Sequence, residues 1–271
     1  MRRVLITGCS SGIGLDAARH LQAGGWQVVA TCRRPQDIAA RRAEGMECLH
    51  LDLSDEASTA ACAEAALAGG PLDALVNNAA FALPGAVEDM PRGALRAIFE
   101  ANVFGWHELT RQVIPVMRAQ GHGRIVQNSS ILGFVVAQWR GAYVSTKFAL
   151  EGLTDTLRIE MRGTGIHVVL IEPGPVTSLI RQNAIPHFER WIDWRNSPRK
   201  IQYAALRYRL YEDRGRDRFE LPASAVTKKL IHALESPRPR PRYYVTTPTY
   251  LMGGLRRILP TRALDWLISK G

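Results

Sequence analysis

The chain has 271 residues, of which 46% are hydrophobic and 22% charged, as expected for a globular protein with one large α/β domain. No apolar run approaches the roughly 18 residues that cross a bilayer, the first apolar run is too short for a signal peptide, and the four cysteines lack metal-ligand or redox spacing, as in a reducing cytoplasm. The net charge of +10 falls on the last third, because residues 181–271 hold 19 Lys and Arg against 8 Asp and Glu.

The first predicted strand, residues 3–7, runs into the glycine-rich segment TGCSSGIG and then into a helix over about residues 15–23. A strand, a glycine turn and a helix form a phosphate cradle, because backbone N–H groups and the positive end of the helix dipole face the turn. The spacing of Gly8, Gly12 and Gly14 is G-x-x-x-G-x-G, which differs from the dinucleotide fingerprint G-x-G-x-x-G. A tight structural turn without a ligand therefore remains the alternative.

The second predicted strand, residues 27–31, ends in Cys32, Arg33 and Arg34. At this point of a βαβ unit an acidic residue binds the ribose 2′-hydroxyl of NAD, whereas an arginine accommodates the 2′-phosphate of NADP. The absence of an acid and the two arginines favour NADP(H), with Ser11 as a second phosphate contact. Alternatively, the arginines are solvated loop charges.

The third and fourth predicted strands also lead into residues suited to a dinucleotide. Residues 46–51 lead into Asp52 and Leu53, and an aspartate at the end of a strand can accept a hydrogen bond from the adenine amino group. Residues 72–76 lead into the segment NNAA at 77–80.

A long helix is predicted next, over about residues 92–117, and it carries Asn102. Asparagine has a poor helix propensity, so its presence needs a reason. One reason is functional, since the amide would bind backbone and water beside Lys147. The alternative is a polar surface position.

The residues with the clearest chemistry are Ser130, Tyr143 and Lys147. A strand predicted at 124–128 places Ser130 at a strand's carboxyl end, where open α/β sheets bind their ligands. In a helix over residues 143–157, Tyr143 and Lys147 lie at i and i+4 on one face, so the ammonium is expected to lower the phenol pKa from about 10 toward neutrality. Such a tyrosine can exchange a proton with an alcohol or ketone whose oxygen Ser130 holds. A chance pairing of tyrosine and lysine is the alternative.

A sixth strand, residues 167–171, leads into EPGPVTS. The prolines around Gly174 exclude a helix and predict a rigid turn suited to lining a nicotinamide ring. Alternating strands and helices predict an α/β fold with a parallel, doubly wound sheet. No repeat or linker interrupts the pattern, so we expect residues 1–271 to form a single domain.

Five signals now occur in one order: TGCSSGIG, NNAA, Asn102, Ser130 with the later Tyr143-x-x-x-Lys147, and PG. Over about residues 3–180 the chain closely resembles the short-chain dehydrogenase/reductase family. The resemblance implies a Rossmann-type sheet of about seven strands in the order 3-2-1-4-5-6-7, with helices on both faces. It also implies an enzyme that interconverts an alcohol and a ketone or aldehyde by hydride transfer with NADP(H).

The resemblance assigns roles residue by residue. In the implied catalytic tetrad, Tyr143 is the acid and base, Lys147 lowers the pKa of Tyr143 and holds the nicotinamide ribose, Ser130 positions the substrate oxygen, and Asn102 holds a water. The implied cofactor-binding residues are Gly8, Ser10, Ser11, Gly12, Ile13, Gly14, Arg33, Asp52, Leu53, Asn78, Ala79, Ala80, Tyr143, Lys147, Pro173, Gly174, Val176, Thr177 and Ser178. Ala80 replaces a glycine of the family pattern and Ser178 a threonine, which is expected to alter cofactor affinity only slightly.

Substrate choice in this family lies after the PG turn, here in about residues 179–221. The segment holds seven aromatic residues among many arginines, which predicts a mobile, partly helical lid over a bulky apolar substrate. Alternatively, the aromatic residues are core residues of two short helices. The segments ATCR and YVSTKFALEGL look more specifically like hydroxysteroid and retinol dehydrogenases, so a steroid, a retinoid or a long-chain carbonyl compound is the expected substrate.

Two other functions compete with this interpretation. The first is a non-catalytic, dinucleotide-sensing module on the same fold, and the complete tetrad argues against it. The second is nucleic-acid binding through the basic last third, which lacks a recognisable motif. For assembly, the resemblance implies a homodimer or homotetramer formed through the helices at about 92–117 and 143–162.

The tail, about residues 238–271, is basic and amphipathic. Residues 250–268 place apolar side chains at helical spacing on both sides of Pro260, with Arg256, Arg257 and Arg262 among them. This pattern suits a helix in a membrane interface, so we expect peripheral contact with a membrane surface. Packing against the same domain or a sister subunit is the alternative.

Overall fold

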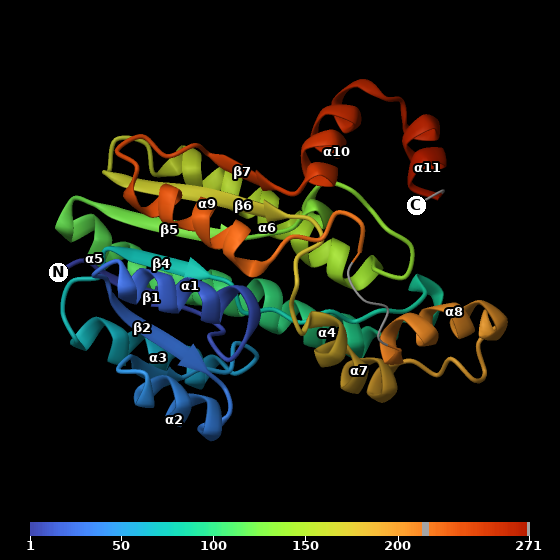
Figure 1. Ribbon diagram of the computed structural model, residues 1–271, viewed down its shortest axis with the longest axis horizontal. Helices are drawn as coiled ribbons and strands as arrows, with labels where there is room; N and C mark the ends of the chain where they lie inside the picture. Colours follow the sequence, from blue (N-terminus) through green and yellow to red (C-terminus); the bar gives the residue numbers. More distant parts are fainter. Residues whose placement is uncertain (213–216, 270–271) are drawn as a thin grey trace.

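The computed structural model describes residues 1–212 and 217–269. Within these ranges, seven parallel strands form one sheet in the order β3-β2-β1-β4-β5-β6-β7, as expected from the sequence (Figure 1). The strands are β1 (Arg3–Ile6), β2 (Gln27–Cys32), β3 (Glu47–His50), β4 (Ala74–Asn77), β5 (Gly123–Asn128), β6 (Ile166–Pro173) and β7 (Arg242–Val245). The order reverses between β1 and β4, so the carboxyl ends of these two strands border the crevice in which such sheets bind ligands.

Helices cover both faces of the sheet. They are α1 (Gly12–Ala23), α2 (Pro35–Ala43), α3 (Glu56–Ala68), α4 (Arg92–Phe99), α5 (Gly105–Gln120), α6 (Gly141–Glu160), α7 (Ile180–Trp191), α8 (Lys200–Tyr211), α9 (Ala223–Glu235), α10 (Thr247–Ile258) and α11 (Thr261–Ser269). In Figure 1, α1 and α9 lie in front of the sheet, and α5 and α6 lie behind it. Strand β1 shows why both faces are covered: Val4 and Ile6 belong to the apolar core under α1 and α9, and Leu5 belongs to the core under α3 and α5.

The expected single helix over residues 92–117 is wrong. It is divided into α4 and α5 by a wide π-helical turn, η2 (Glu100–Phe104), which contains Asn102. Asn102 is fully buried, and its side chain accepts a hydrogen bond from the backbone N–H of Phe81 and donates one to the Phe81 carbonyl. These two bonds draw the asparagine out of the regular helical register, as in other π turns at functional sites. The surface position considered for Asn102 is therefore also wrong.

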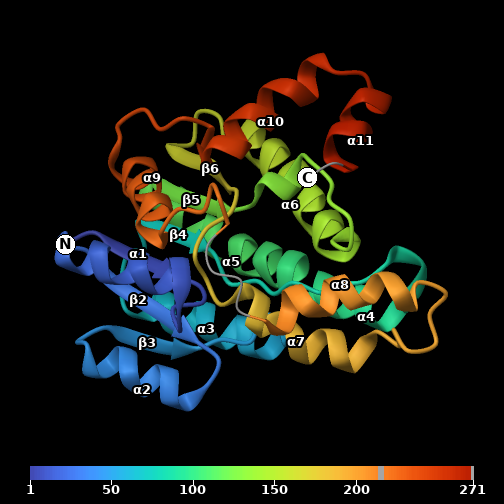
Figure 2. The same cartoon turned by 45° about the vertical axis from the view of Figure 1, so that its right-hand side comes forward.

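The segment at about residues 179–221 was expected to form either a lid or part of the core. Some of its aromatic residues are buried in the core, and others are exposed. Phe188 on α7 and Tyr203 on α8 are fully buried in a third apolar cluster, which also contains Tyr143. Tyr211 and Phe219 are exposed. Figure 2 shows α7 and α8 beside α4, away from the strands. The aromatic residues thus divide into a buried floor and an exposed outer surface.

The tail forms two helices that meet at Pro260, as the apolar spacing predicts. Helix α10 packs against β7 and the short turn η3 (Ile131–Gly133), with Thr249 and Gly253 buried. None of residues 261–269, all of which are described, is buried. Packing against the same chain therefore accounts for α10 but not for α11. No helix within residues 1–212 and 217–269 is long and apolar enough to span a membrane.

Candidate active site

The glycine turn between β1 and α1 is held against the end of β4. Gly8 has a positive φ of 75°, and a Cβ placed on it would lie 2.8 Å from the Cβ of Ala79. A Cβ on Gly14 would lie 2.2 Å from the Gly8 carbonyl oxygen. The Thr7 hydroxyl fixes the contact, because it accepts hydrogen bonds from the backbone N–H groups of Asn78 (2.8 Å) and Ala79 (2.9 Å). Any larger residue at these glycines would fill the cradle or push the strands apart.

The rim of this cradle brings together the other residues expected around a dinucleotide. Ser10, Ser11, Gly12 and Ile13 are partly exposed at the start of α1. A Cβ on Gly12 would lie 3.4 Å from the Cβ of Ser178, so the segment after β6 lies directly against the glycine turn. The expected residues at both sides of the cofactor crevice are thus neighbours in space.

The arginine expected at a 2′-phosphate stands at the ends of β2 and β3. Arg33 is largely exposed, and its guanidinium lies 4.0 Å from the carboxylate of Asp52. That carboxylate accepts hydrogen bonds from the backbone and hydroxyl of Ser54. Cys32 and Leu53 are buried beside them. The position at which an acidic residue would bind a ribose therefore holds a buried thiol, and the only exposed charge next to it in sequence is cationic.

Ser130 begins the turn that follows β5. Its hydroxyl accepts a hydrogen bond from the backbone N–H of Leu132 (3.1 Å) and donates one to the Pro173 carbonyl (3.4 Å). The Ser130 hydroxyl also lies beside the phenol of Tyr143, in the first turn of α6, where it favours the ionised form of that phenol. The serine therefore connects the ends of β5 and β6 to the tyrosine, as the sequence spacing predicts.

The expected shift of the Tyr143 pKa toward neutrality is wrong for this arrangement. Burial raises the pKa of Tyr143 to about 12, against smaller opposing effects of the Ser130 hydrogen bond and the Arg140 charge. The Lys147 ammonium is held by other groups. It donates a hydrogen bond to the Asn128 carbonyl (2.9 Å) and lies 4.3 Å from the ring centroid of Trp106, compared with 5.6 Å from that of Tyr143.

Lys147 is itself destabilised in its charged form. Burial lowers the pKa of Lys147 to about 7, and the Glu151 carboxylate opposes that shift. A lysine that is partly neutral near pH 7 stabilises a neighbouring phenolate less than a permanent cation does. The charge of Lys147 therefore changes near neutral pH. Sequence spacing alone does not reveal this property.

Asn102 approaches this group through the side chain of Thr146. Its amide nitrogen donates to the hydroxyl of Thr146 at 3.4 Å, in addition to its bonds with Phe81. Thr146 is the residue before Lys147 on α6. The expected bond between the asparagine amide and backbone is present, and the amide braces the helix turn that carries Lys147.

The segment after β6 is tied at both ends. Gly174 donates its backbone N–H to the Val245 carbonyl at 3.1 Å, and a Cβ on it would clash with Thr246. Further on, Thr177 donates its backbone N–H to the Leu221 carbonyl at 3.0 Å. The two ends of the segment at about residues 179–221 therefore lie side by side at the cofactor crevice.

Three contributors to the site were not expected from the sequence. The Asn128 carbonyl fixes the Lys147 ammonium, and the Trp106 ring covers it. Arg140 lies three residues before Tyr143, and its pKa is lowered, first by burial and then by the charges of Arg209 and Arg181. For Arg140 the only available signal was its position one turn before the tyrosine.

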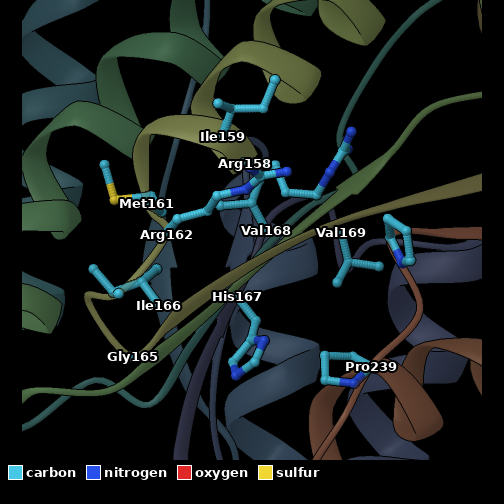
Figure 3. Close-up of a pocket in the computed structure, with 12 residues that line it drawn as sticks. Arg158, Ile159, Met161, Arg162, Gly165, Ile166, His167, Val168, Val169 and Pro239 are labelled. Atoms are coloured by element: carbon cyan, nitrogen blue, oxygen red, sulfur yellow. The ribbon is translucent and has the colours of Figure 1, made fainter.

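A cavity of about 470 Å³ lies elsewhere, at the amino end of β6 (Figure 3). Its walls come from the end of α6 and from the segment before β7, including Arg158, His167 and Pro239. Tyr143 and Ser130 lie at the opposite, carboxyl end of the sheet, where β6 ends in Pro173. This cavity is therefore separate from the group of residues described above.

Comparison with known proteins agrees with this geometry. The family model described as short chain dehydrogenase matches residues 2–187. The chain is 36% identical over 270 residues to the uncharacterized oxidoreductase YbbO of Escherichia coli (strain K12), covering 99% of this chain and 94% of that protein. It is 31% identical to human 17-beta-hydroxysteroid dehydrogenase type 1, over 90% of this chain and 77% of that protein. A solved short-chain dehydrogenase from Streptomyces avermitilis superposes with a TM-score of 0.79 at 28% identity, covering 99% of this chain and 97% of that chain.

Proposed function

This chain belongs to the short-chain dehydrogenase/reductase family, and from that premise we propose that it reduces a bulky apolar ketone or aldehyde, or oxidises the corresponding alcohol, with NADP(H). Its family relationship already makes it an oxidoreductase that acts on CH–OH or carbonyl groups with NAD(P). The observation that carries the proposal is the grouping of Ser130 and Tyr143 with the buried Lys147 at the carboxyl edge of the sheet.

The residues around the crevice fit a dinucleotide. Gly8 and Gly14 allow the turn to pack closely against Ala79 and against its own backbone, and the start of α1, which has no side-chain cap, is free to bind phosphate through its backbone N–H groups. When bound there, the cofactor supplies the hydride. Lys147 would hold the nicotinamide ribose, and the segment Pro173 to Ser178 would line the nicotinamide.

The protein's own contribution is the proton. In the reductive direction the Tyr143 phenol donates its proton to the substrate oxygen, while the Ser130 hydroxyl holds that oxygen by a hydrogen bond. A pKa of about 12 keeps the phenol protonated at neutral pH and therefore ready to donate. The Lys147 ammonium stabilises the phenolate that remains. Asn102 braces the turn before Lys147 through Thr146.

The preference for NADP(H) over NAD(H) rests on the ends of β2 and β3. Arg33 is exposed and can turn toward a 2′-phosphate, with Ser11 across the crevice as a second contact. Hydrogen bonds from Ser54 hold the Asp52 carboxylate in place. In this position Asp52 would bind the adenine edge of the cofactor rather than its ribose.

The apolar character of the substrate is supported by the segment at about 179–221. Phe188 and Tyr203 form a fixed apolar floor in the cluster that contains Tyr143, whereas Tyr211 and Phe219 remain exposed on the outer side. One relative acts, by its name, on a hydroxysteroid. A lid with a rigid floor and two adjacent ends is suited to closing over a large substrate.

We also propose a homodimer or homotetramer and a peripheral contact between the tail and a membrane surface. Exposed Leu153 and Ile159 on α6 support a subunit contact. For the tail, Ile258 is 80% exposed and Trp266 is 64% exposed, and Arg256, Arg257 and Arg262 lie nearby in the sequence. The whole chain would act as one domain in the cytoplasm, where its four free, buried cysteine thiols would stay reduced.

An NADPH-consumption screen over steroids, retinal and medium-chain aldehydes tests the proposal directly. Turnover of at least one apolar carbonyl compound is expected, with NADPH used more efficiently than NADH. NADPH binding without turnover across the panel would instead favour the dinucleotide-sensing function. Turnover restricted to small polar carbonyl compounds would contradict the apolar substrate.

A further inference from the structure

A group of buried charged side chains lies directly behind Lys147. Tyr143, Lys147 and Glu151 follow one another at four-residue spacing on α6, so they share one face of the helix. Glu151 is buried, and it approaches Glu172 on β6, which is completely buried. The tyrosine, the lysine and the two carboxyl groups therefore lie in succession along one buried side of α6.

One guanidinium serves three carboxyl groups on or beside α6. Arg242 on β7 donates to Glu151, to Glu172 at 2.5 Å and to Asp155 at 2.5 Å. Within the described part of the chain, Oε1 of Glu151 and Oε2 of Glu172 are buried and lack a hydrogen-bond donor. Asp155 is more exposed and also pairs with Arg158, so the two buried carboxyl groups, Glu151 and Glu172, share the single Arg242 cation. Two buried carboxylates beside one cation leave an excess of negative charge, which one proton would relieve.

Glu172 is the group that holds this proton. Burial, and then the charge of Glu151, raises the pKa of Glu172 to about 8, against the opposing effect of Arg242. A proton on Glu172 can join the two carboxyl groups, which satisfies both of the oxygens that lack donors. Near neutral pH the pair therefore carries one proton and one negative charge.

The carboxyl pair contacts the site at two further points. A Cβ on Gly133, in the turn that begins at Ser130, would lie 2.7 Å from Oε1 of Glu151. Glu172 directly precedes Pro173, whose carbonyl accepts the hydrogen bond of the Ser130 hydroxyl. Changes of charge in the pair are thus transmitted to a rigid, closely packed part of the site.

A cavity and several charged groups surround the pair Glu151 and Glu172 and can affect its protonation. A cavity of about 590 Å³ adjoins Glu151 and separates α6 from β7 and α10. The other titratable or charged groups around the pair are Lys147, Asp155 and Arg158 on α6, Arg242 and Tyr244 on β7, and Arg256 and Arg257 on α10. The cavity reaches Glu151 and gives this carboxyl group a route for proton exchange with solvent.

We propose that Glu151 is a positioning residue that keeps Lys147 in its ammonium form, and that proton exchange at Glu172 makes this effect depend on pH. Burial lowers the pKa of Lys147 to about 7, and Glu151 is the group that opposes the shift. Without its charge, Lys147 would be a neutral amine at neutral pH. The consequence for catalysis rests on the proposed function, but the charge of Lys147 can be measured without it.

The test is an NMR titration of the lysine side chains. The chain has only five lysines, so protein labelled with ¹³C at lysine Cε gives few signals, and Lys147→Met assigns the relevant one. In Glu151→Gln, which preserves the shape of the side chain, the titration midpoint of Lys147 should fall by about one pH unit, the size expected for one nearby charge. Glu160→Gln removes an exposed charge from the same helix and should leave the midpoint unchanged. An unchanged midpoint in a folded Glu151→Gln protein overturns the proposal.

A second variant keeps the proposal testable if Glu151→Gln does not fold. In the wild type, loss of the Glu172 proton above about pH 8 adds a negative charge, so the Lys147 titration should extend to higher pH. Glu172→Gln should remove this upper part, and an identical titration in both proteins overturns the role of Glu172. In active enzyme, Glu151→Gln should move the rising limb of alcohol oxidation to higher pH. A failed NADPH screen would contradict the proposed reaction. An unchanged Lys147 titration would contradict only the role of Glu151.

Discussion

The catalytic edge of the sheet and the last third of the chain are built on opposite principles. At the sheet edge, Asn102 and Lys147 are buried, and each of these two side chains has hydrogen-bond partners on other elements. In the last third, large apolar side chains such as Ile258 and Trp266 are exposed beside arginines, although its charge alone would predict a hydrated surface. The first region fixes one geometry, whereas the second combines a buried core, which includes Phe188 and Tyr203, with exposed apolar side chains.

The contrast between buried polar groups and exposed apolar groups indicates which residues determine which part of the function. Buried polar groups must be satisfied within the chain, so their residue types and spacing are strongly constrained and can be read from sequence. Exposed apolar groups gain energy only from a substrate, a subunit or a membrane. We therefore expect the residues of the first region to determine the reaction, and the exposed residues of the second to influence the choice of substrate and partner.

The substitution Tyr143→Phe tests this comparison with the largest expected effect. We expect turnover to fall by about 10²-fold or more while NADPH binding is nearly intact, because only the proton donor is lost. Steady-state kinetics and fluorescence titration with NADPH measure the two quantities. Tyr250→Phe on exposed α10 is the matched control and should leave turnover unchanged. Retention of more than about a tenth of wild-type kcat in Tyr143→Phe would show that another group supplies the proton.

The second prediction separates the buried floor of the lid from its outer surface. Phe188→Ala should lower the free energy of unfolding by about 3–5 kcal/mol, because it empties a fully buried site beside Tyr203. Phe219→Ala, at an exposed position, should change it by only about 0.5 kcal/mol. Urea denaturation of both variants measures this. Equal losses would mean that the last third is packed uniformly, which contradicts the division drawn here.

The fold was predictable because each strand is a short apolar run followed by a turn signal. The strand order and the meeting of Ser130, Tyr143 and Lys147 follow from spacing and from the resemblance to one family. The break of the long helix at Asn102 was not predictable, because the apolar periodicity continues across residues 92–117 and the cause is a bond to the distant Phe81.

The electrostatics of the site were predicted least well, since they depend on burial and on distant residues. Spacing on α6 indicated that Lys147 would lower the Tyr143 pKa, but burial acts on both groups and outweighs their proximity. Arg242 joins Glu151 across 91 positions of sequence. No local pattern reveals such a pair before the sheet order is known.

A third prediction tests cofactor choice at the edge between the two regions. Cys32→Asp combined with Arg33→Ala should reverse the preference from NADPH to NADH. The expected change in the ratio of kcat/KM values is roughly 10-fold to 100-fold, because one charged hydrogen-bonding partner is lost and a like charge is added. Arg34→Ala is the control, since Arg34 is paired with Asp37 at 2.8 Å. A wild-type enzyme that already favours NADH would contradict the assignment of Arg33.

A fourth prediction concerns the exposed face of α6. Light scattering of the wild type should give a multiple of 30.1 kDa, and Leu153→Glu should shift it toward the monomer because a buried charge at an apolar contact is costly. Ile201→Glu, at an exposed position on α8, should have no such effect. A wild-type mass near that of one chain at micromolar concentration would exclude the oligomer.

The last and smallest effect is expected at α11, where the second region is most exposed. We predict that the protein binds vesicles containing anionic lipid, that salt weakens the binding, and that Ile258→Ser with Trp266→Ser reduces affinity by about tenfold. Substitution is preferable to deletion of residues 249–271, because α10 packs on β7 and its loss would disturb the domain. Ile201→Ser removes a comparably exposed side chain outside the tail and serves as the control. Equal sedimentation of all three proteins with the vesicles would assign α11 to a sister subunit, and the mass of the tail variant would then fall while that of the control would not.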